Sequence, residues 1–391
     1  MSSRFFPLAT TTWDTNEYDS MQRVIASGQF TMGAKVKAFE ERFANFFGAK
    51  YAVMSNSGSS ANLLAVAAMR YSKNQSFDGR DEIIVPAVSW STTYYPVSQL
   101  GFKLRFVDID LPSLNMGLES IRAAINEKTA GIFAVNLLGN PAPLAELADL
   151  ARRKGIFLIE DNCESMGATI DGKFAGTFGE IGTFSTFFSH HISTMEGGVC
   201  VTDDLELAQI MTSMRAHGWT RELPDENEVH NKSGDAFEDS FRFVLPGYNL
   251  RPLELSGALG LEQLKKVPAI VDGRRKNAQL FRGIFSSKPY LSIQQEHGES
   301  SWFGFALILR GSLKGRRNEV VAEFAKHEID SRPIVAGNFA LNPVLKHLNH
   351  APLPELQNAT YIHQHGLFVG NHDYDLTAQL SKLEQILDAM A

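Results

Sequence analysis

Cysteine is the scarcest residue in this chain, with only Cys163 and Cys200 among 391 residues. Two thiols cannot build a framework of several disulfides, and they do not form the paired CxxC motifs of structural zinc sites. A chain with so few cysteines is typical of a reducing compartment. We therefore expect a cytoplasmic protein.

Long apolar runs and blocks of like charge are also missing. No apolar segment reaches the roughly 18 residues that a membrane span requires. The opening MSSRFFPLATTTWD lacks the apolar stretch of a secretory signal. The formal net charge is −7 and basic residues do not cluster, so no nucleic-acid surface is indicated. These absences favour a protein that acts on a small molecule, with no membrane or nucleic-acid partner.

Short apolar runs alternate with helical patterns between about residues 50 and 205. Seven runs read as strands: YAVMSNSG, EIIVPAVS, LRFVDID, AGIFAVNLLG, IFLIEDN, IGTFSTFF and GGVCVTD. Several are apolar almost throughout rather than alternating, as strands covered by helices on both faces are. The pattern predicts an α/β fold with a seven-stranded, mostly parallel sheet.

Helical patterns lie between several of these strands: SANLLAVAAMRY, LESIRAAINEK and LAELADLARRKG, the last ending at Gly155 as a stop signal. The polar stretch from Arg221 to Asp239 predicts a surface loop. After GYNLRPLELSGALGLEQLKK the sequence pattern changes: a charged helical pattern follows, and then the short-strand pattern SWFGFALILR. We expect a large domain over residues 1–264 and a smaller C-terminal α/β domain over 265–391.

Residues that follow the strands are the first candidates for a site, because ligands of open α/β sheets gather there. The sequence Ser57-Gly58-Ser59-Ser60 suits an anion at a helix start, or only a turn with a serine N-cap. Trp90 suits stacking on a heteroaromatic ring, or a place in the core or in an interface. Asp161 suits pairing with a protonated ring nitrogen, or an N-cap for ESMGA.

Two adjacent histidines mark the segment FSTFFSHHISTMEGG, residues 184–198. Neighbouring histidines seldom ligate one ion, and further ligands at suitable spacing are missing, so we expect no metal site here. A histidine with an ordinary pKa near 6.5 suits proton transfer at neutral pH.

In their order and spacing these motifs resemble the DegT/DnrJ/EryC family of sugar aminotransferases. The similarity extends through TMGAKVKAFEERFANFFGAKYAVMSNSGSSANLLA, PAVSW, FVDID, EDNCESMGA, RAHGW and PGYNLRPLELSGALG. It implies the type I, or aspartate aminotransferase, fold and pyridoxal 5′-phosphate or pyridoxamine 5′-phosphate as cofactor. It also implies a homodimer with shared active sites.

The resemblance assigns roles by position. Residues similar to those that bind the cofactor are Gly58, Ser59 and Ser185 at the phosphate, Trp90 on the ring, Asp161 at the pyridine nitrogen, Glu164 where many relatives have glutamine, and Asn249 from the other subunit. Substrate contacts are implied for His217, and Arg251 and Arg332 suit carboxylate or diphosphate groups. A surface ion pair is an equally good interpretation of Arg332.

His190 is where the chain departs from the aminotransferases, which have there the lysine that bonds covalently to the cofactor. No lysine occurs between Lys173 and Lys232. An imidazole cannot form that bond, so the cofactor would be held noncovalently and His190 would act as the catalytic base. His191 is expected to pack structurally, with orientation of its neighbour or contact with the cofactor as the alternatives.

This departure is similar to the 3-dehydratases of the family. It implies removal of the C3 hydroxyl of a nucleotide-linked 4-keto-6-deoxy sugar, with L-glutamate as amine donor and ammonia as by-product. GDP and the manno configuration follow from the resemblance alone.

Two alternatives remain open, an aminotransferase using another lysine and a silent nucleotide-sugar-binding homologue, whereas a third relative, an iron–sulfur dehydrase, is excluded. Two cysteines are too few for the cluster of the last.

Overall fold

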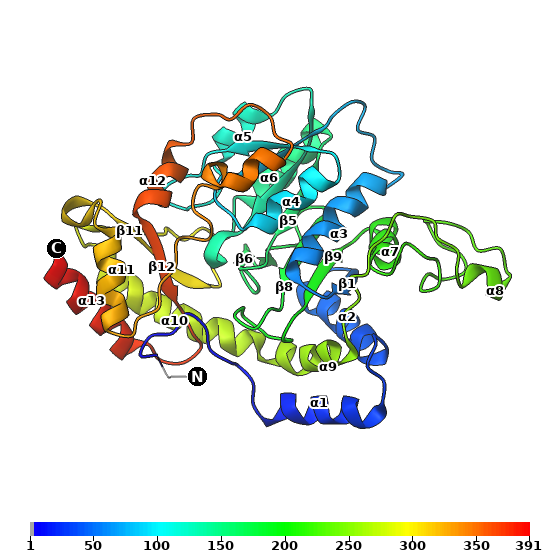
Figure 1. Ribbon diagram of the computed structural model, residues 1–391, viewed down its shortest axis with the longest axis horizontal. Coiled ribbons are helices and arrows are strands. Elements are labelled where there is room, and N and C mark those ends of the chain that lie inside the picture. Colours follow the sequence, from blue (N-terminus) through cyan, green and yellow to red (C-terminus); the bar gives the residue numbers. More distant parts are fainter. Residues whose placement is uncertain (1–3) are drawn as a thin grey trace.

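A computed structural model describes residues 4–391 of the chain. Its centre is a seven-stranded sheet in the order β1-β9-β8-β5-β4-β2-β3 (Figure 1). The strands are β1 Tyr51–Ser55, β2 Glu82–Pro86, β3 Lys103–Val107, β4 Thr129–Val135, β5 Phe157–Asp161, β8 Ile181–Ser185 and β9 Gly198–Thr202. Only β9 runs antiparallel to its neighbours, β1 and β8. The predicted seven-stranded, mostly parallel sheet is therefore confirmed.

Helices cover both faces of this sheet. They are α2 Ala34–Phe47, α3 Gly58–Tyr71, α4 Ser91–Gln99, α5 Leu118–Ala124, α6 Leu144–Lys154, α7 Leu205–Met214 and α9 Glu254–Gln263, and α1 Thr15–Ser27 packs outside them on α9. The middle of strand β2 shows why such runs are continuously apolar: Ile83 and Val85 join one hydrophobic cluster, and Ile84 joins another. Successive side chains point to opposite faces of a strand, and here each face meets a packed layer.

A second, three-stranded antiparallel sheet lies beside the first, in the order β10-β11-β12. It comprises β10 Leu291–Ile293, β11 Gly304–Leu309 and β12 Gly366–Gly370, with helices α10 Val267–Phe285, α11 Arg317–Lys326, α12 Gln357–His365 and α13 Thr377–Met390. Phe6 packs in the hydrophobic cluster of this part and pairs with the backbone beside Ile329. The start of the described chain is thus fastened to its C-terminal third.

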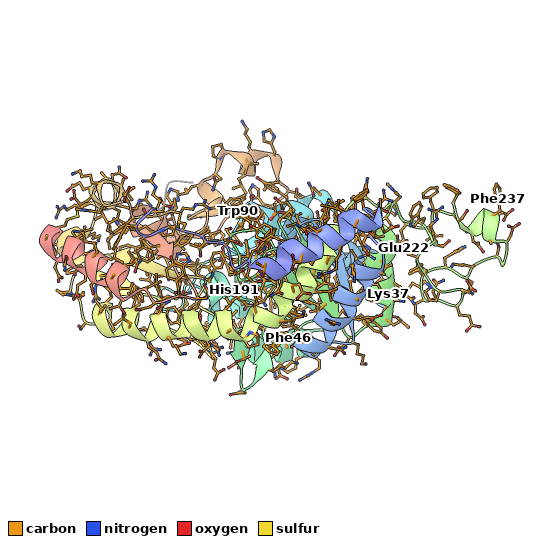
Figure 2. All side chains as sticks on the ribbon, turned by 90° about the horizontal axis from the view of Figure 1, so that it is seen from below. Lys37, Phe46, Trp90, His191, Glu222 and Phe237 are labelled. Atoms are coloured by element: carbon orange, nitrogen blue, oxygen red, sulfur yellow. The ribbon has the colours of Figure 1, made fainter. Side chains whose placement is uncertain are left out.

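Two smaller features complete the fold. Strands β6 Thr169–Ile170 and β7 Lys173–Phe174 form a hairpin. The stretch from Arg221 to Asp239 is mainly irregular, as predicted, and adds the short helix α8 Ala236–Asp239. This stretch projects from the body of the molecule beyond α7, with Phe237 at its outer end (Figure 2). Within residues 4–391, no helix combines the length and apolarity needed to cross a bilayer.

Candidate functional site

A cavity of about 350 Å³ opens where β1, β2, β4, β5 and β8 end. This is the edge at which ligands bind in open α/β sheets. The structure brings together there eight residues singled out from the sequence: Gly58, Ser59, Trp90, Asp161, Glu164, Ser185, His190 and Arg332. They come from segments far apart in the chain, so the fold assembles the site.

The start of α3 forms a narrow cradle on the cavity wall. A Cβ atom at Gly58 would lie 2.6 Å from Cβ and 2.9 Å from Oγ of Ser185, so only glycine fits. Ser57 caps the helix by accepting a hydrogen bond of 3.1 Å from the Ser60 N–H. The N-cap interpretation is thus confirmed, and the exposed helix start together with the Ser59 and Ser185 hydroxyls still offers donors to a phosphate.

Asp161 ends β5 as a buried carboxylate. Its Oδ2 accepts hydrogen bonds of 2.8 Å from Asn62 Nδ2 and from Thr93 Oγ1, and its Oδ1 accepts one of 3.2 Å from the Cys163 N–H. No helix follows it, so the helix N-cap interpretation is wrong. Asn62 and Thr93 were missed in the sequence, because nothing in their local patterns sets them apart from ordinary helix residues.

Trp90 immediately precedes α4 and lies on the cavity wall. Its side chain is 57% exposed, so the interpretation as a core residue is wrong. A large indole that remains exposed beside a cavity is available to stack on a flat ligand ring.

His190 lies in the loop between β8 and β9, and its Nδ1 is 2.7 Å from the carbonyl oxygen of Cys163. A carbonyl only accepts hydrogen bonds, so Nδ1 carries the hydrogen and Nε2 keeps a lone pair. Burial lowers the pKa of His190 to about 4, against the partly opposing effects of the Cys163 carbonyl and of Asp161. At neutral pH this imidazole is therefore uncharged and able to accept a proton.

Glu164 also lines the cavity and accepts a 2.9 Å hydrogen bond from the Leu138 N–H. Burial is the main cause that raises the pKa of Glu164 to about 7, and the nearby charge of Asp161 adds to it. The carboxyl therefore carries a proton in a substantial fraction of molecules at neutral pH.

His191 is buried behind its neighbour and is not among the residues that line the cavity. Its Nε2 is 3.2 Å from the carbonyl oxygen of Ser301, and its ring packs at 5.8 Å from that of Phe303. Phe303 also contacts His190, at 5.2 Å between ring centroids, and was missed in the sequence because it lies more than a hundred residues away.

Arg332 enters the cavity from the side of the second sheet. Its backbone pairs with that of Phe368 in β12, through hydrogen bonds of 3.1 and 2.8 Å. No ion pair of Arg332 is found among the described residues, so the guanidinium is available to an anionic ligand.

Three candidate residues lie outside the cavity and form a group of their own. Arg251 Nε donates a 3.1 Å hydrogen bond to Asn249 Oδ1, and its guanidinium lies 5.9 Å from the ring of Trp219. The ring of His217 packs edge-on against the same indole at 5.4 Å. The structure therefore does not bring Asn249, Arg251 and His217 to the His190 cavity of the same chain.

The cavity fits a pyridoxal phosphate cofactor by its shape and by its chemistry. The cradle at Gly58 suits the phosphate, the buried carboxylate of Asp161 suits a pyridinium, and the indole of Trp90 suits the ring face. No lysine lies among the described lining residues. Together, the two-sheet architecture and this site define a pyridoxal phosphate-dependent enzyme of the type I fold.

The chain belongs to the DegT/DnrJ/EryC1/StrS aminotransferase family, whose model matches residues 12–385. It is 56% identical over 384 residues to the GDP-4-keto-6-deoxy-D-mannose 3-dehydratase of Yersinia pseudotuberculosis, covering 98% of each chain. The family resemblance drawn from the sequence is thereby confirmed.

Solved structures of the same enzyme are similar throughout. The Escherichia coli 3-dehydratase with bound hydrated PLP is 52% identical, with a TM-score of 0.95 over 98% of this chain and 99% of that one. A structure of GDP-4-keto-6-deoxymannose-3-dehydratase with a trapped PLP-glutamate geminal diamine gives 0.94 at 52% identity, over 98% and 100%. The predicted fold class is thus confirmed.

Proposed function

We propose that this chain removes the C3 hydroxyl of GDP-4-keto-6-deoxy-D-mannose and forms GDP-4-keto-3,6-dideoxy-D-mannose. L-glutamate donates an amino group to the noncovalently held cofactor and becomes 2-oxoglutarate, and the amino group later leaves as ammonia. The observation that carries the proposal is the imidazole of His190 in a cavity lined by no lysine among the described residues. The 56% identity to a 3-dehydratase supports the substrate.

Pyridoxamine phosphate, when bound, supplies an amino group for the sugar ketone and a ring that accepts the charge left by proton removal. Asp161, fixed by Asn62 and Thr93, holds a proton on the ring nitrogen. His190 accepts the proton whose removal leaves the charge on the ring, and it does so at Nε2, because its Nδ1 already donates to the Cys163 carbonyl. The protonated Nε2 then donates to the departing C3 hydroxyl, which leaves as water.

Glu164 complements this arrangement. At a pH near its pKa of about 7, half of these carboxyls are protonated and can donate a hydrogen bond. A protonated carboxyl can thus substitute for the amide donor that a glutamine has in related aminotransferases.

Arginine side chains bind the anionic groups of the substrates. Arg332 lines the cavity and suits a carboxylate or a diphosphate, because a guanidinium binds either with two parallel hydrogen bonds. Arg251 and His217 contribute to the substrate site from the second subunit, together with Asn249 at the cofactor phosphate.

The proposed assembly is a homodimer with shared active sites. It is supported by the separation of the Asn249 group from the cavity of its own chain. It is also supported by exposed aromatic side chains on the projecting stretch and just after it: Phe237, Phe241 and Phe243. Phe237 is 86% exposed and stands at its outer end (Figure 2), where water is an unfavourable neighbour for a phenyl ring.

Mixing two inactive variants tests the shared site. His190→Asn lacks the base, and Asn249→Ala lacks the partner-side contact. If each site combines His190 of one chain with Asn249 of the other, a mixed dimer retains one intact site, and random mixing restores about a quarter of the wild-type activity. The measurement is dehydration after joint refolding or coexpression. No recovery above either variant alone would contradict the shared site.

The reaction itself is tested by product formation. Purified protein given pyridoxal phosphate, L-glutamate and GDP-4-keto-6-deoxy-D-mannose is expected to release ammonia and 2-oxoglutarate, measured by coupled assay, and to give a nucleotide sugar lighter by one oxygen atom, measured by mass spectrometry. Formation of a 4-amino sugar without ammonia would favour the aminotransferase alternative. No turnover, with the nucleotide sugar still bound, would favour the silent homologue.

The domain division at residue 265 belongs to the same proposal. It is supported by the start of α10 at Val267 and by the separate hydrophobic cluster of the second sheet. The cytoplasm is the proposed compartment, supported by the free thiols of Cys163 and Cys200.

A further inference from the structure

The loop that carries His190 is tied to the rest of the molecule at Ser193. The Ser193 N–H donates a 2.9 Å hydrogen bond to Gln263 Oε1, and its carbonyl accepts a 3.0 Å bond from the indole N–H of Trp13. Both backbone groups of this residue, three positions after His190, are therefore bound outside the loop. Their partners belong to the N-terminal segment and to the last residue of α9.

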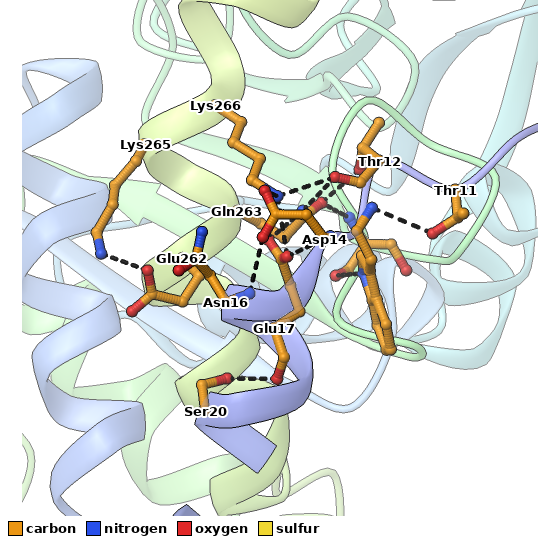
Figure 3. Close-up of polar contacts among 12 residues, drawn as sticks. Thr11, Thr12, Asp14, Asn16, Glu17, Ser20, Glu262, Gln263, Lys265 and Lys266 are labelled. Carbon is orange, nitrogen blue, oxygen red and sulfur yellow. Dashed lines mark hydrogen bonds and ion pairs between the residues drawn. The ribbon is translucent and has the colours of Figure 1, made fainter. Parts of the chain in front are cut away.

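Gln263 is fully buried and uses both ends of its side chain. Besides Ser193, its Oε1 accepts a 2.7 Å bond from Thr12 Oγ1, while its Nε2 donates to Glu17 Oε1 at 2.7 Å and to the Thr12 carbonyl at 3.3 Å (Figure 3). An amide with donors and acceptors matched at both ends has one favourable orientation. It therefore presents its oxygen to Ser193 in a fixed position.

The N-terminal segment that supplies Trp13 is itself held in place. Lys266 Nζ lies 2.7 Å from Oε1 of the fully buried Glu17 and 2.9 Å from Asp14 Oδ2. It also donates a 3.0 Å bond to the Thr12 carbonyl. A buried carboxylate persists only when it is paired, so this network fastens the start of α1 to the end of α9 (Figure 3).

We infer that Gln263 and Trp13 are positioning residues for His190, through the backbone of Ser193. Among residues 4–391, the side chain of His190 has one hydrogen bond, to the Cys163 carbonyl, and its backbone N–H is bonded within the same loop, to Phe187. The two hydrogen bonds to the Ser193 backbone limit how far the loop can shift toward solvent. Because a displacement of a catalytic group by about 1 Å can lower a rate about 10²-fold, these two hydrogen bonds affect the rate of catalysis. The inference rests on the proposed function for the role of His190.

The test is Trp13→Phe, which removes the indole N–H and keeps an aromatic ring. We expect kcat for dehydration to fall at least about 10-fold with little change in KM. In the protein without cofactor, hydrogen exchange in peptides covering residues 186–197 should accelerate. The pKa of His190 should rise from about 4 toward 6.5 as water reaches the ring, measured by NMR of labelled histidine with His190→Asn for assignment.

Lys265→Ala is the matched control, because it breaks an exposed pair with Glu262 in the same helical turn (Figure 3). It should leave kcat, exchange and the His190 titration unchanged. The inference would be overturned if Trp13→Phe kept the hydrogen exchange and the His190 titration of the wild type. It would also be overturned if hydrogen exchange accelerated while kcat stayed undiminished. The exchange and titration readouts need neither cofactor nor substrate, so failure of the proposed reaction would be seen separately, as absent ammonia release by the wild type.

Discussion

Replacement of His190 by lysine is expected to abolish dehydration and to create a covalent bond between the new amine and the cofactor aldehyde. A positioned general base contributes about 10²–10⁴-fold to a rate, and a lysine bonded to the cofactor is no longer free to act in the same way. The bond is expected to give a visible absorption band that borohydride removes. Both the rate and the spectrum are measured on one preparation.

His190→Asn separates the two consequences of this substitution. Asparagine cannot accept the proton and cannot bond to the aldehyde, so this variant should lose activity without gaining the visible band. Dehydration retained by His190→Lys at more than about a tenth of the wild-type rate would contradict the assignment of His190 as the base.

Asp161→Asn is expected to lower the dehydration rate about 10²-fold or more, which is the usual cost of removing one preorganised electrostatic partner. The amide has nearly the same shape but no negative charge to hold a proton on the ring nitrogen. The rate is measured at saturating cofactor, so that weaker binding does not imitate the effect.

Thr93→Val offers a graded companion to that variant. It removes one of the two 2.8 Å hydrogen bonds to Asp161 Oδ2 while leaving the carboxylate in place. A smaller loss is expected, near the few-fold effect of one buried hydrogen bond. An Asp161→Asn enzyme as active as Thr93→Val would show that the charge is not needed.

The sheet was predictable because its signal is local. Each of the seven runs is short, apolar and bounded by turn residues, and Gly155 ends α6 with φ of 59°, as its position after LARRK predicts. Helix α5 is shorter than the pattern LESIRAAINEK predicts and ends at Ala124. Asn126 stops it, because its side chain accepts a 2.7 Å bond from the Lys128 N–H and thereby closes a turn.

The site was predictable only in part. Gly58 and His190 follow strands and Asp161 ends one, so the sheet edge alone places them together. Phe303 and Arg332 reach the same cavity from the second sheet, and no periodicity encodes that approach. The ties from Trp13 and Gln263 to Ser193 depend on two further segments meeting, which only the folded arrangement reveals.

The Cys163 carbonyl that fixes His190 comes two residues after Asp161 on one continuous stretch of backbone. The same short stretch of backbone therefore sets the positions of both the proton acceptor and the carboxylate opposite the ring nitrogen. Exchange of the single side chain at position 190 can therefore change the outcome of the reaction, while the backbone that sets the spacing across the coenzyme stays the same.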